Sequence, residues 1–437
     1  MASLPWYVTL GGIFGAVVVL TFAGLPVFVV FLLINVAGIV LFLGHSAFGM
    51  FANSLVTTLT SEAFITVPLF LLMGEMLSRS RAIEDLYEAC DSLLGATRIR
   101  LYTLCTLVAT IVGTVSGSAM ADAAMLGRSI YPGMIARGYD KRISTGLILA
   151  GATIAPIIPP SILTVVLAIL ANASVAKLLI AGTLPGILLA VLYIAYAWVR
   201  VALDPSKAPP LDTSIHRTFG DRMRGLARML PFAFVMFMVI GLMLLGIASP
   251  TESAALGVAS CVLTALWAGT LGWEMIWTSL KGAAKISGAI FAIIMSASLF
   301  GQLLSFTGAT DQMVEMVKGL DVPPWAIFMM LLGSTWLAGM FLGATEWMLI
   351  SVPVFSPIIN TLGFDPIWFW TLYLITIVTG GMTPPFGITM FVFKAAVPGS
   401  NLMDIYNSTW PFVAVIFFGI FIMWLFPQIV LILPQLM

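Results

Sequence analysis

The sequence has few charged residues and few of the residues that hold metals or perform catalysis. Charged residues make up 9% of its 437 residues, and there are only 3 cysteines and 2 histidines. The cysteines are isolated, which argues against a disulfide framework or a zinc site. We interpret the lone histidines, His45 and His216, as structural or surface residues. The net charge of +0 gives no indication of nucleic-acid binding.

Two catalytic patterns are also missing from the sequence. It contains no GxxxxGK[ST] phosphate-binding loop and no HExxH metal-binding helix. The chain is therefore not expected to hydrolyse ATP itself, and an intramembrane hydrolase is poorly supported. We predict that the protein is not an enzyme.

Long apolar runs dominate the sequence, and 60% of its residues are hydrophobic. A bilayer needs about 20 apolar residues per helical span. The runs are continuous rather than alternating, which favours helices over a barrel. We predict an all-α, multi-pass membrane protein with spans near residues 6–23, 26–44, 62–78, 142–171, 178–200, 229–247, 251–268, 286–305, 366–396 and 408–432.

Two further apolar stretches, 101–130 and 325–360, each contain a Gly/Ser/Thr break in the middle. We interpret them as re-entrant hairpins. The spans 142–171 and 366–396 are broken too, by Gly and Pro. Broken backbone in hydrocarbon is costly unless protein, water or ligand satisfies its polar groups. Interrupted helices are therefore typical of a transport site.

Positive charge is distributed unevenly over the loops. With the N-terminus outside and both hairpins re-entrant, all of the 19 Lys and Arg residues except Lys177 and Lys318 lie on or near the cytoplasmic side. Both termini are then outside. Residues 79–96 and 309–320 mix charge with apolar positions at helical spacing, which predicts interfacial helices. We favour bracing arms over simple solvated connectors.

The two halves of the chain resemble each other. Residues 74–78 (GEMLS) match 301–305 (GQLLS), and 158–160 (IPP) match 383–385 (TPP). Each half holds five spans and one hairpin, and this odd number of crossings requires the second half to be inverted. We predict an inverted repeat over 1–200, a cytoplasmic basic connector over 201–228 and a second repeat over 229–437. Such repeats with broken helices are typical of secondary transporters.

The helix breaks supply the candidate site. Free N–H groups at a break favour a carboxylate, and free carbonyls with hydroxyl groups favour Na⁺. Candidate substrate-binding residues are Ser116, Gly117, Ser118, Pro159, Pro160, Ser161, Thr383, Pro384 and Pro385. Candidate Na⁺ ligands are Gly113, Ser116, Gly151, Gly343, Thr345, Thr379, Gly380 and Thr383. The alternative is that these small residues only permit close helix packing and the prolines only kink helices.

Three carboxylates require separate interpretations. Asp122 and Glu346 follow the two hairpin tips. They bind a coupling cation or relay a proton in one interpretation, and in the other they simply face water at the tips. Glu252 follows Ser249-Pro-Thr at the start of a span, which predicts a role at a helix N-terminus.

Several segments together resemble the large membrane subunit of the tripartite ATP-independent periplasmic (TRAP) transporters. The segments are VPLFLLMGEMLSRS (67–80), GTVSGSAMADAAMLG (113–127), YPGMIARGYD (131–140), IIPPSI (157–162), LIAGTLPGILLA (179–190), SPTESAALG (249–257) and GGMTPPFGITMFV (380–392). They occur in the family's order over nearly the whole chain.

The resemblance implies an elevator-type, Na⁺-coupled importer of the bacterial inner membrane, with a fold of the ion-transporter superfamily kind. It also implies two partners, a four-span small membrane subunit and a periplasmic substrate-binding protein. The implied cargo is an organic anion such as a sialic acid or a dicarboxylate. Two alternatives stay open: a stand-alone dicarboxylate or ion antiporter without a receptor, and a membrane scaffold subunit without a transport site.

Overall fold

The computed structural model describes residues 11–12, 15–17, 19–21, 23–44, 47–80, 82–211, 218–319 and 321–437. These residues form helices and connecting loops, with no strand among them. Half of the residues of the predicted span 6–23 lie outside the described residues, and so do His45 and His216. Within the described part, the all-α prediction is confirmed.

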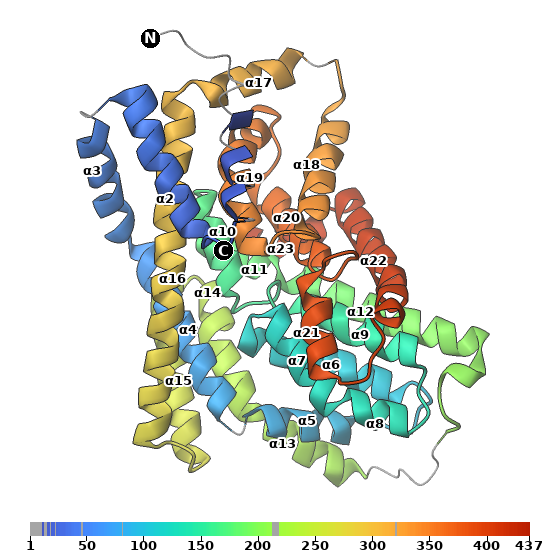
Figure 1. The fold of residues 1–437 in the computed structure, drawn as a ribbon. Coiled ribbons are helices and arrows are strands. Elements are labelled where there is room, and N and C mark those ends of the chain that lie inside the picture. The colour runs from blue at the N-terminus through green and yellow to red at the C-terminus, as the bar shows by residue number, and fades with distance from the viewer. Residues whose placement is uncertain are drawn as a thin grey trace.

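The helices of the first half differ widely in length (Figure 1). They are α2 (Val27–Gly38), α3 (Ala47–Leu59), α4 (Glu62–Arg79), α5 (Ala82–Leu93), α6 (Arg100–Ser116), α7 (Ala119–Ser129), α8 (Tyr131–Ala136), α9 (Lys141–Ile154), α10 (Ile162–Leu170), α11 (Val175–Ala181) and α12 (Thr183–Leu203). A π-helical turn, Ile39–Leu43, follows α2, and a 3₁₀ turn, Pro205–Lys207, follows α12.

The second half contains a similar succession of helices. They are α13 (Phe219–Met236), α14 (Leu242–Leu244), α15 (Pro250–Trp267), α16 (Trp273–Phe306), α17 (Ala309–Gly319), α18 (Pro324–Gly339), α19 (Ala344–Thr361), α20 (Pro366–Gly380), α21 (Ile388–Ala396), α22 (Leu402–Leu425) and α23 (Gln428–Gln435). A π-helical segment, Phe237–Gly241, joins α13 to α14. Apart from the short helix α8, helices α16 to α21 follow the same order as α4 to α10: a long helix, an arm, a helix pair and a broken helix.

Four stretches are long and apolar enough to cross a membrane as single helices. Among the described residues they are Val175–Leu203, Phe219–Leu244, Trp273–Phe306 and Leu402–Leu425. Helices α3 and α4 form a further candidate as a pair bent by 46°. The other predicted spans appear as shorter or interrupted helices. These lengths and apolar surfaces identify a multi-pass membrane protein.

The structure corrects three predicted boundaries. Helix α16 begins at Trp273 rather than near residue 286, and it is 34 residues long. The predicted span 408–432 ends at Leu425, because the chain turns before Pro427 and starts α23. The basic connector 201–228 is shorter than predicted, since α13 already begins at Phe219.

Side-chain capping explains two of the helix starts. Thr218 and Asp221 form a reciprocal capping box at the start of α13. Ser249 and Glu252 form the same motif at the start of α15, which confirms the predicted role of Glu252. Helix α3 is an additional helix between the predicted spans 26–44 and 62–78. Its Thr57 and Thr58 hydroxyls donate hydrogen bonds to carbonyls one turn earlier, at 2.9 and 2.7 Å.

Both predicted interfacial segments are helical. Helix α5 packs against α13, whereas α17 packs against α19 and α16. The two lie at opposite ends of the molecule, α5 at the bottom and α17 at the top of Figure 1. Helices α9 and α20 lie at the centre, and every residue of Ile143–Ile154 and of Ile367–Gly380 is buried.

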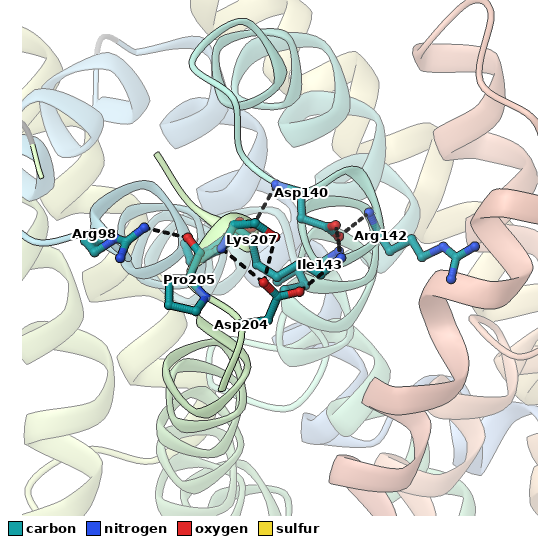
Figure 2. Close-up of polar contacts among 9 residues, drawn as sticks. Arg98, Asp140, Arg142, Ile143, Asp204, Pro205 and Lys207 are labelled. Carbon is teal, nitrogen blue, oxygen red and sulfur yellow. Dashed lines mark hydrogen bonds and ion pairs between the residues drawn. The ribbon is translucent and has the colours of Figure 1, made fainter. Parts of the chain in front are cut away.

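A polar cluster fastens the base of α6 to the loop after α12 (Figure 2). Arg98 donates hydrogen bonds to the carbonyls of Pro205 at 2.5 Å, Ala208 at 3.2 Å and Pro209 at 3.3 Å. Lys207 Nζ lies 2.9 Å from Asp140 Oδ2. This loop therefore cannot leave the helix bundle without breaking several charge-assisted bonds.

Asp140 joins the polar cluster to the start of α9. Its Oδ1 accepts hydrogen bonds from the backbone N–H groups of Arg142 and Ile143, both at 3.0 Å. Burial raises the pKa of the Asp140 carboxyl, but Lys207 and these N–H groups outweigh burial and hold the pKa below its ordinary value. The carboxylate is therefore charged at neutral pH and caps α9 effectively.

Candidate functional site

The first helix break joins α6 to α7 at Gly117. This glycine has a φ of +58°, in the left-handed region that favours glycine. The Ser116 hydroxyl accepts a hydrogen bond from the Ser118 N–H at 3.2 Å, and Ser118 caps α7 through the Ala121 N–H. The short break thus ends one helix and immediately starts another, with its hydroxyls satisfying part of the freed backbone.

The second break lies between α9 and α10 and contains the first proline pair. The Ser161 hydroxyl donates to the Pro156 carbonyl at 2.6 Å and accepts from the Thr164 N–H at 3.2 Å. The Thr164 hydroxyl also donates to the Pro156 carbonyl, at 3.1 Å. Pro159 and Pro160 are buried. Side-chain hydroxyls therefore satisfy backbone that the prolines and the break leave without helical partners.

The third and fourth breaks follow the same plan in the second half. Helix α18 ends at Gly339 and α19 starts after Gly343, while α20 ends at Gly380 and α21 starts after Gly387. In the fourth break the Thr389 N–H donates to the Gly381 carbonyl at 3.0 Å, which holds the loop compact.

The two halves interlock through these broken helices. Helix α7 packs against α21, α10 packs against α19 and α9 packs against α20. Tyr131, at the start of α8, makes an edge-to-face contact with Phe393 of α21, and their ring centroids are 5.4 Å apart. Each broken helix of one half is therefore in contact with a helix next to a break in the other half.

A cavity of about 610 Å³ lies where the four breaks meet. Each break contributes lining residues: Ser116 to Ser118, Pro156, Leu342 with Gly343, and Gly381. Helices α4 and α16 close one side of the cavity with Leu71, Gly74, Glu75, Ser78, Ile286 and Ile290. The volume is in the range of small-molecule sites, which is about 300–1,000 Å³.

The cavity contains only some of the residues predicted for the site. Those that line it are Ser116, Gly117, Ser118, Gly343, Thr345 and Glu346. Those that do not line it are Gly113, Asp122, Gly151, Pro159, Pro160, Ser161, Thr379, Gly380, Thr383, Pro384 and Pro385. The predicted substrate-binding set thus divides into a group on the cavity wall and a group behind it.

Asp122 lies directly behind the first break. Its side chain is 1% exposed, and Oδ1 accepts a hydrogen bond from the Ser116 hydroxyl at 2.5 Å. Oδ2 has no hydrogen-bond partner among the described residues. An ideal Cβ on Gly113 would lie 2.9 Å from Oδ2 and 2.9 Å from Ala155 Cα. Gly113, Ser116 and Asp122 are therefore close together, whereas Gly151 faces Ala109 of α6.

The backbone next to the fourth break packs tightly against helix α18. The Thr383 hydroxyl is fully buried, donates to the Thr379 carbonyl at 2.7 Å and accepts from Trp336 Nε1 at 3.2 Å. A Cβ on Gly380 would lie 2.7 Å from the Gly339 backbone. These contacts give Thr379, Gly380 and Thr383 a packing role in this conformation. Pro385 is exposed, and its carbonyl accepts from the Tyr406 hydroxyl at 2.5 Å.

The residues predicted for the site include none from the cavity wall that α4 and α16 form. Glu75 of α4 lines the cavity and pairs with Arg79 one turn later, at 2.9 Å. It also touches α16, where a Cβ on Gly282 would lie 2.8 Å from the Glu75 carboxyl carbon. Glu75 occurs in the repeated GEMLS segment, a signal that could have drawn attention to it. Groups of three or more His, Cys, Asp or Glu that could hold a metal are absent from the described residues.

Comparisons with known proteins agree on one family. The family model described as "Tripartite ATP-independent periplasmic transporter, DctM component" matches residues 14–429. The ectoine/5-hydroxyectoine TRAP transporter large permease protein of Ruegeria pomeroyi is 26% identical over 97% of this chain and 98% of its own length. The C4-dicarboxylate TRAP transporter large permease protein of Pseudomonas aeruginosa is 27% identical over 86% and 87%.

Two solved transporter structures share the fold. The Alcanivorax borkumensis YdaH transporter matches with a TM-score of 0.63 and 12% identity, over 90% of this chain and 89% of its own. MtrF of Neisseria gonorrhoeae matches with a TM-score of 0.63 and 13% identity, over 87% and 85%. Both matches concern architecture alone.

Proposed function

Because the chain belongs to the DctM component family of the tripartite ATP-independent periplasmic transporters, we propose that it forms the transport path of a Na⁺-coupled importer. The solute is a small organic molecule with a carboxylate. A periplasmic substrate-binding protein delivers it, and a four-span small membrane subunit accompanies this chain in the bacterial inner membrane. Na⁺ is a co-transported substrate in this proposal.

One observation carries the proposal: four helix breaks meet at a single cavity. Helices α7, α10, α19 and α21 all begin at the breaks, and the first residues of each line the cavity. Helix N-termini attract anions through free N–H groups and the helix dipole. The preceding helix ends leave carbonyls free, and these suit Na⁺, which binds to neutral oxygens in broken-helix transporters.

The two sides of the cavity support an elevator motion. One side consists of the interlocked breaks, and the other consists of the long helices α4 and α16, which pack against each other. We propose that the breaks move as one body along α4 and α16. The arms α5 and α17 then connect the moving body to this frame from opposite ends, as an inverted repeat requires.

Reconstitution tests the transport function. Proteoliposomes that contain this chain and the small membrane subunit, with the loaded binding protein outside, are expected to accumulate solute only under an inward Na⁺ gradient. Uptake that ignores the Na⁺ gradient would overturn the coupling. Uptake by this chain alone, without either partner, would favour a stand-alone transporter instead.

Hydroxyl groups at the first and fourth breaks provide a sharper test of the cation. Ser116→Ala removes the hydroxyl that donates to Asp122, and we expect a higher Na⁺ concentration for half-maximal uptake. Thr383→Ala is expected to have the same effect, although its hydroxyl lies behind the cavity wall. Unchanged Na⁺ dependence in both variants, with normal protein yield, would remove both residues from the cation site.

A further inference from the structure

We propose that the solute is a zwitterion, with one carboxylate and one cationic group, rather than a dicarboxylate. This inference rests on the proposed transport function and concerns the same cavity. Two carboxylates, Glu75 and Glu346, line the cavity, and none of the described residues that line it is Lys, Arg or His. Arg79, which is not among the lining residues, forms an ion pair with Glu75.

The N-terminus of α7 is open toward the cavity. Ser118 caps the Ala121 N–H, whereas the N–H groups of Ala119 and Met120 belong to the first helical turn and have no acceptor within the helix. Both residues line the cavity, and Met120 is 48% exposed. This helix end offers a place for one carboxylate of a solute.

The N-terminus of α19 is already covered by a carboxylate. Glu346 is in the first turn of α19 and folds back over Gly343, so that a Cβ on Gly343 would overlap Glu346 Oε2. A second anionic group at this helix end would meet the Glu346 charge instead of free N–H groups. The two hairpin tips are therefore different: one accepts an anion, and the other presents one.

Glu75 adds a second carboxylate on the frame side. Arg79 binds Glu75 through Oε2 only, by Nε at 3.1 Å and Nη2 at 2.9 Å. Oε1 receives no hydrogen bond from Arg79, and Glu75 is half-buried on the cavity wall. A solute with an ammonium or amidinium group gains a hydrogen-bond acceptor in Glu75 Oε1 and attraction to Glu346. A second carboxylate is repelled by Glu346 and gains nothing from Glu75, whose charge Arg79 offsets.

Most of the remaining wall is apolar. Helices α10, α16, α20 and α21 contribute Ile162, Leu163, Ile286, Ile290, Ile377, Val378 and Ile388. Such a wall suits a compact ring or alkyl body between the two charged ends. The low polarity also strengthens the charge interactions at both ends, because little water screens them.

A binding measurement without the substrate-binding protein isolates the selectivity of this cavity. The purified complex of this chain with its small membrane subunit is heated in Na⁺ buffer with ectoine, glycine betaine, pyroglutamate or succinate. Ectoine and pyroglutamate are both small cyclic carboxylates, but only ectoine carries a positive charge. We expect the zwitterions to raise the melting temperature and the two anions to leave it unchanged.

Charge-removing variants connect the effect to the cavity. Glu346→Gln and Glu75→Gln are each expected to raise the Kd for the stabilising zwitterion about tenfold or more. Glu315→Gln, an exposed residue of α17 outside the cavity, is the matched control and should bind as the unmodified protein does. If one cavity variant does not fold, the other carries the test.

Three results would overturn the zwitterion assignment. They are stabilisation by succinate or pyroglutamate equal to that by the zwitterions, no stabilisation by either zwitterion, and unchanged Kd in both cavity variants. Each leaves the Na⁺-driven uptake assay unaffected, so the broader transport function can stand when this inference fails. Loss of Na⁺ coupling would instead remove the function itself.

Discussion

The contact between α18 and α20 allows a prediction whose magnitude follows from backbone distances. A Cβ on Gly380 would lie 2.7 Å from the Cα and carbonyl carbon of Gly339, and 2.8 Å from the Trp336 carbonyl oxygen. Carbon atoms in good contact are about 3.5–4.0 Å apart. Gly380→Ala therefore forces the two helices apart by roughly 1 Å, because backbone atoms cannot turn aside as side chains do.

We expect this substitution to cost about 1–3 kcal/mol of folding free energy, as overpacking in other cores does. The melting temperature of the purified protein should fall by roughly 1–3 °C, since the unfolding entropy of a chain of this length is large. Because the displaced segment leads directly into the fourth break, Na⁺-driven uptake should fall as well, and Gly380→Val should abolish it.

Gly333→Ala is the matched control. Gly333 lies on the same helix α18, and nothing is within 4 Å of the Cβ that the substitution adds. Its melting temperature and uptake should equal those of the unmodified protein. A Gly380→Ala protein as stable and active as Gly333→Ala would refute the argument that close backbone packing positions the fourth break.

Two further predictions concern regions away from the cavity. Arg98→Ala removes hydrogen bonds to three carbonyls of the loop after α12. Thermal unfolding should show a loss of about 1.5–3 kcal/mol in the free energy of unfolding. Arg98→Lys should be intermediate, because an ammonium group cannot reproduce the guanidinium fork. An Arg98→Ala protein of unchanged stability would contradict the fastening role. The cysteines Cys90, Cys105 and Cys261 are buried, and burial together with the Asp91 carboxylate raises the pKa of the Cys90 thiol to about 11. Maleimide at pH 8 should therefore label the native protein slowly and the SDS-denatured protein fast, and rapid native labelling would show that these helices open.

Many features of the fold could be predicted from local sequence. The apolar runs determine a helical membrane protein, because backbone in hydrocarbon must form its own hydrogen bonds. Helices end near Gly117 and at the Pro-Pro pairs, since glycine adopts positive φ and proline lacks an N–H. The start of α15 follows from the Ser249–Glu252 capping box, and the two arms follow from the helical spacing of their charged and apolar residues.

The tertiary structure alone decided which side chains meet at the cavity. Residues Ile143–Ile154 of α9 and Ile367–Gly380 of α20 are buried on all sides, so no exposed face in these segments indicates an orientation. Ser161 and Thr383 are predicted site residues, and the tertiary structure places their hydroxyls against nearby backbone carbonyls instead of on the cavity wall. Their roles in binding stay predictions. Glu75 reaches the cavity only because α4 packs beside α16 and opposite the breaks. Contacts between helices far apart in the chain depend on how surfaces fit together, and the sequence of either helix by itself does not contain that information.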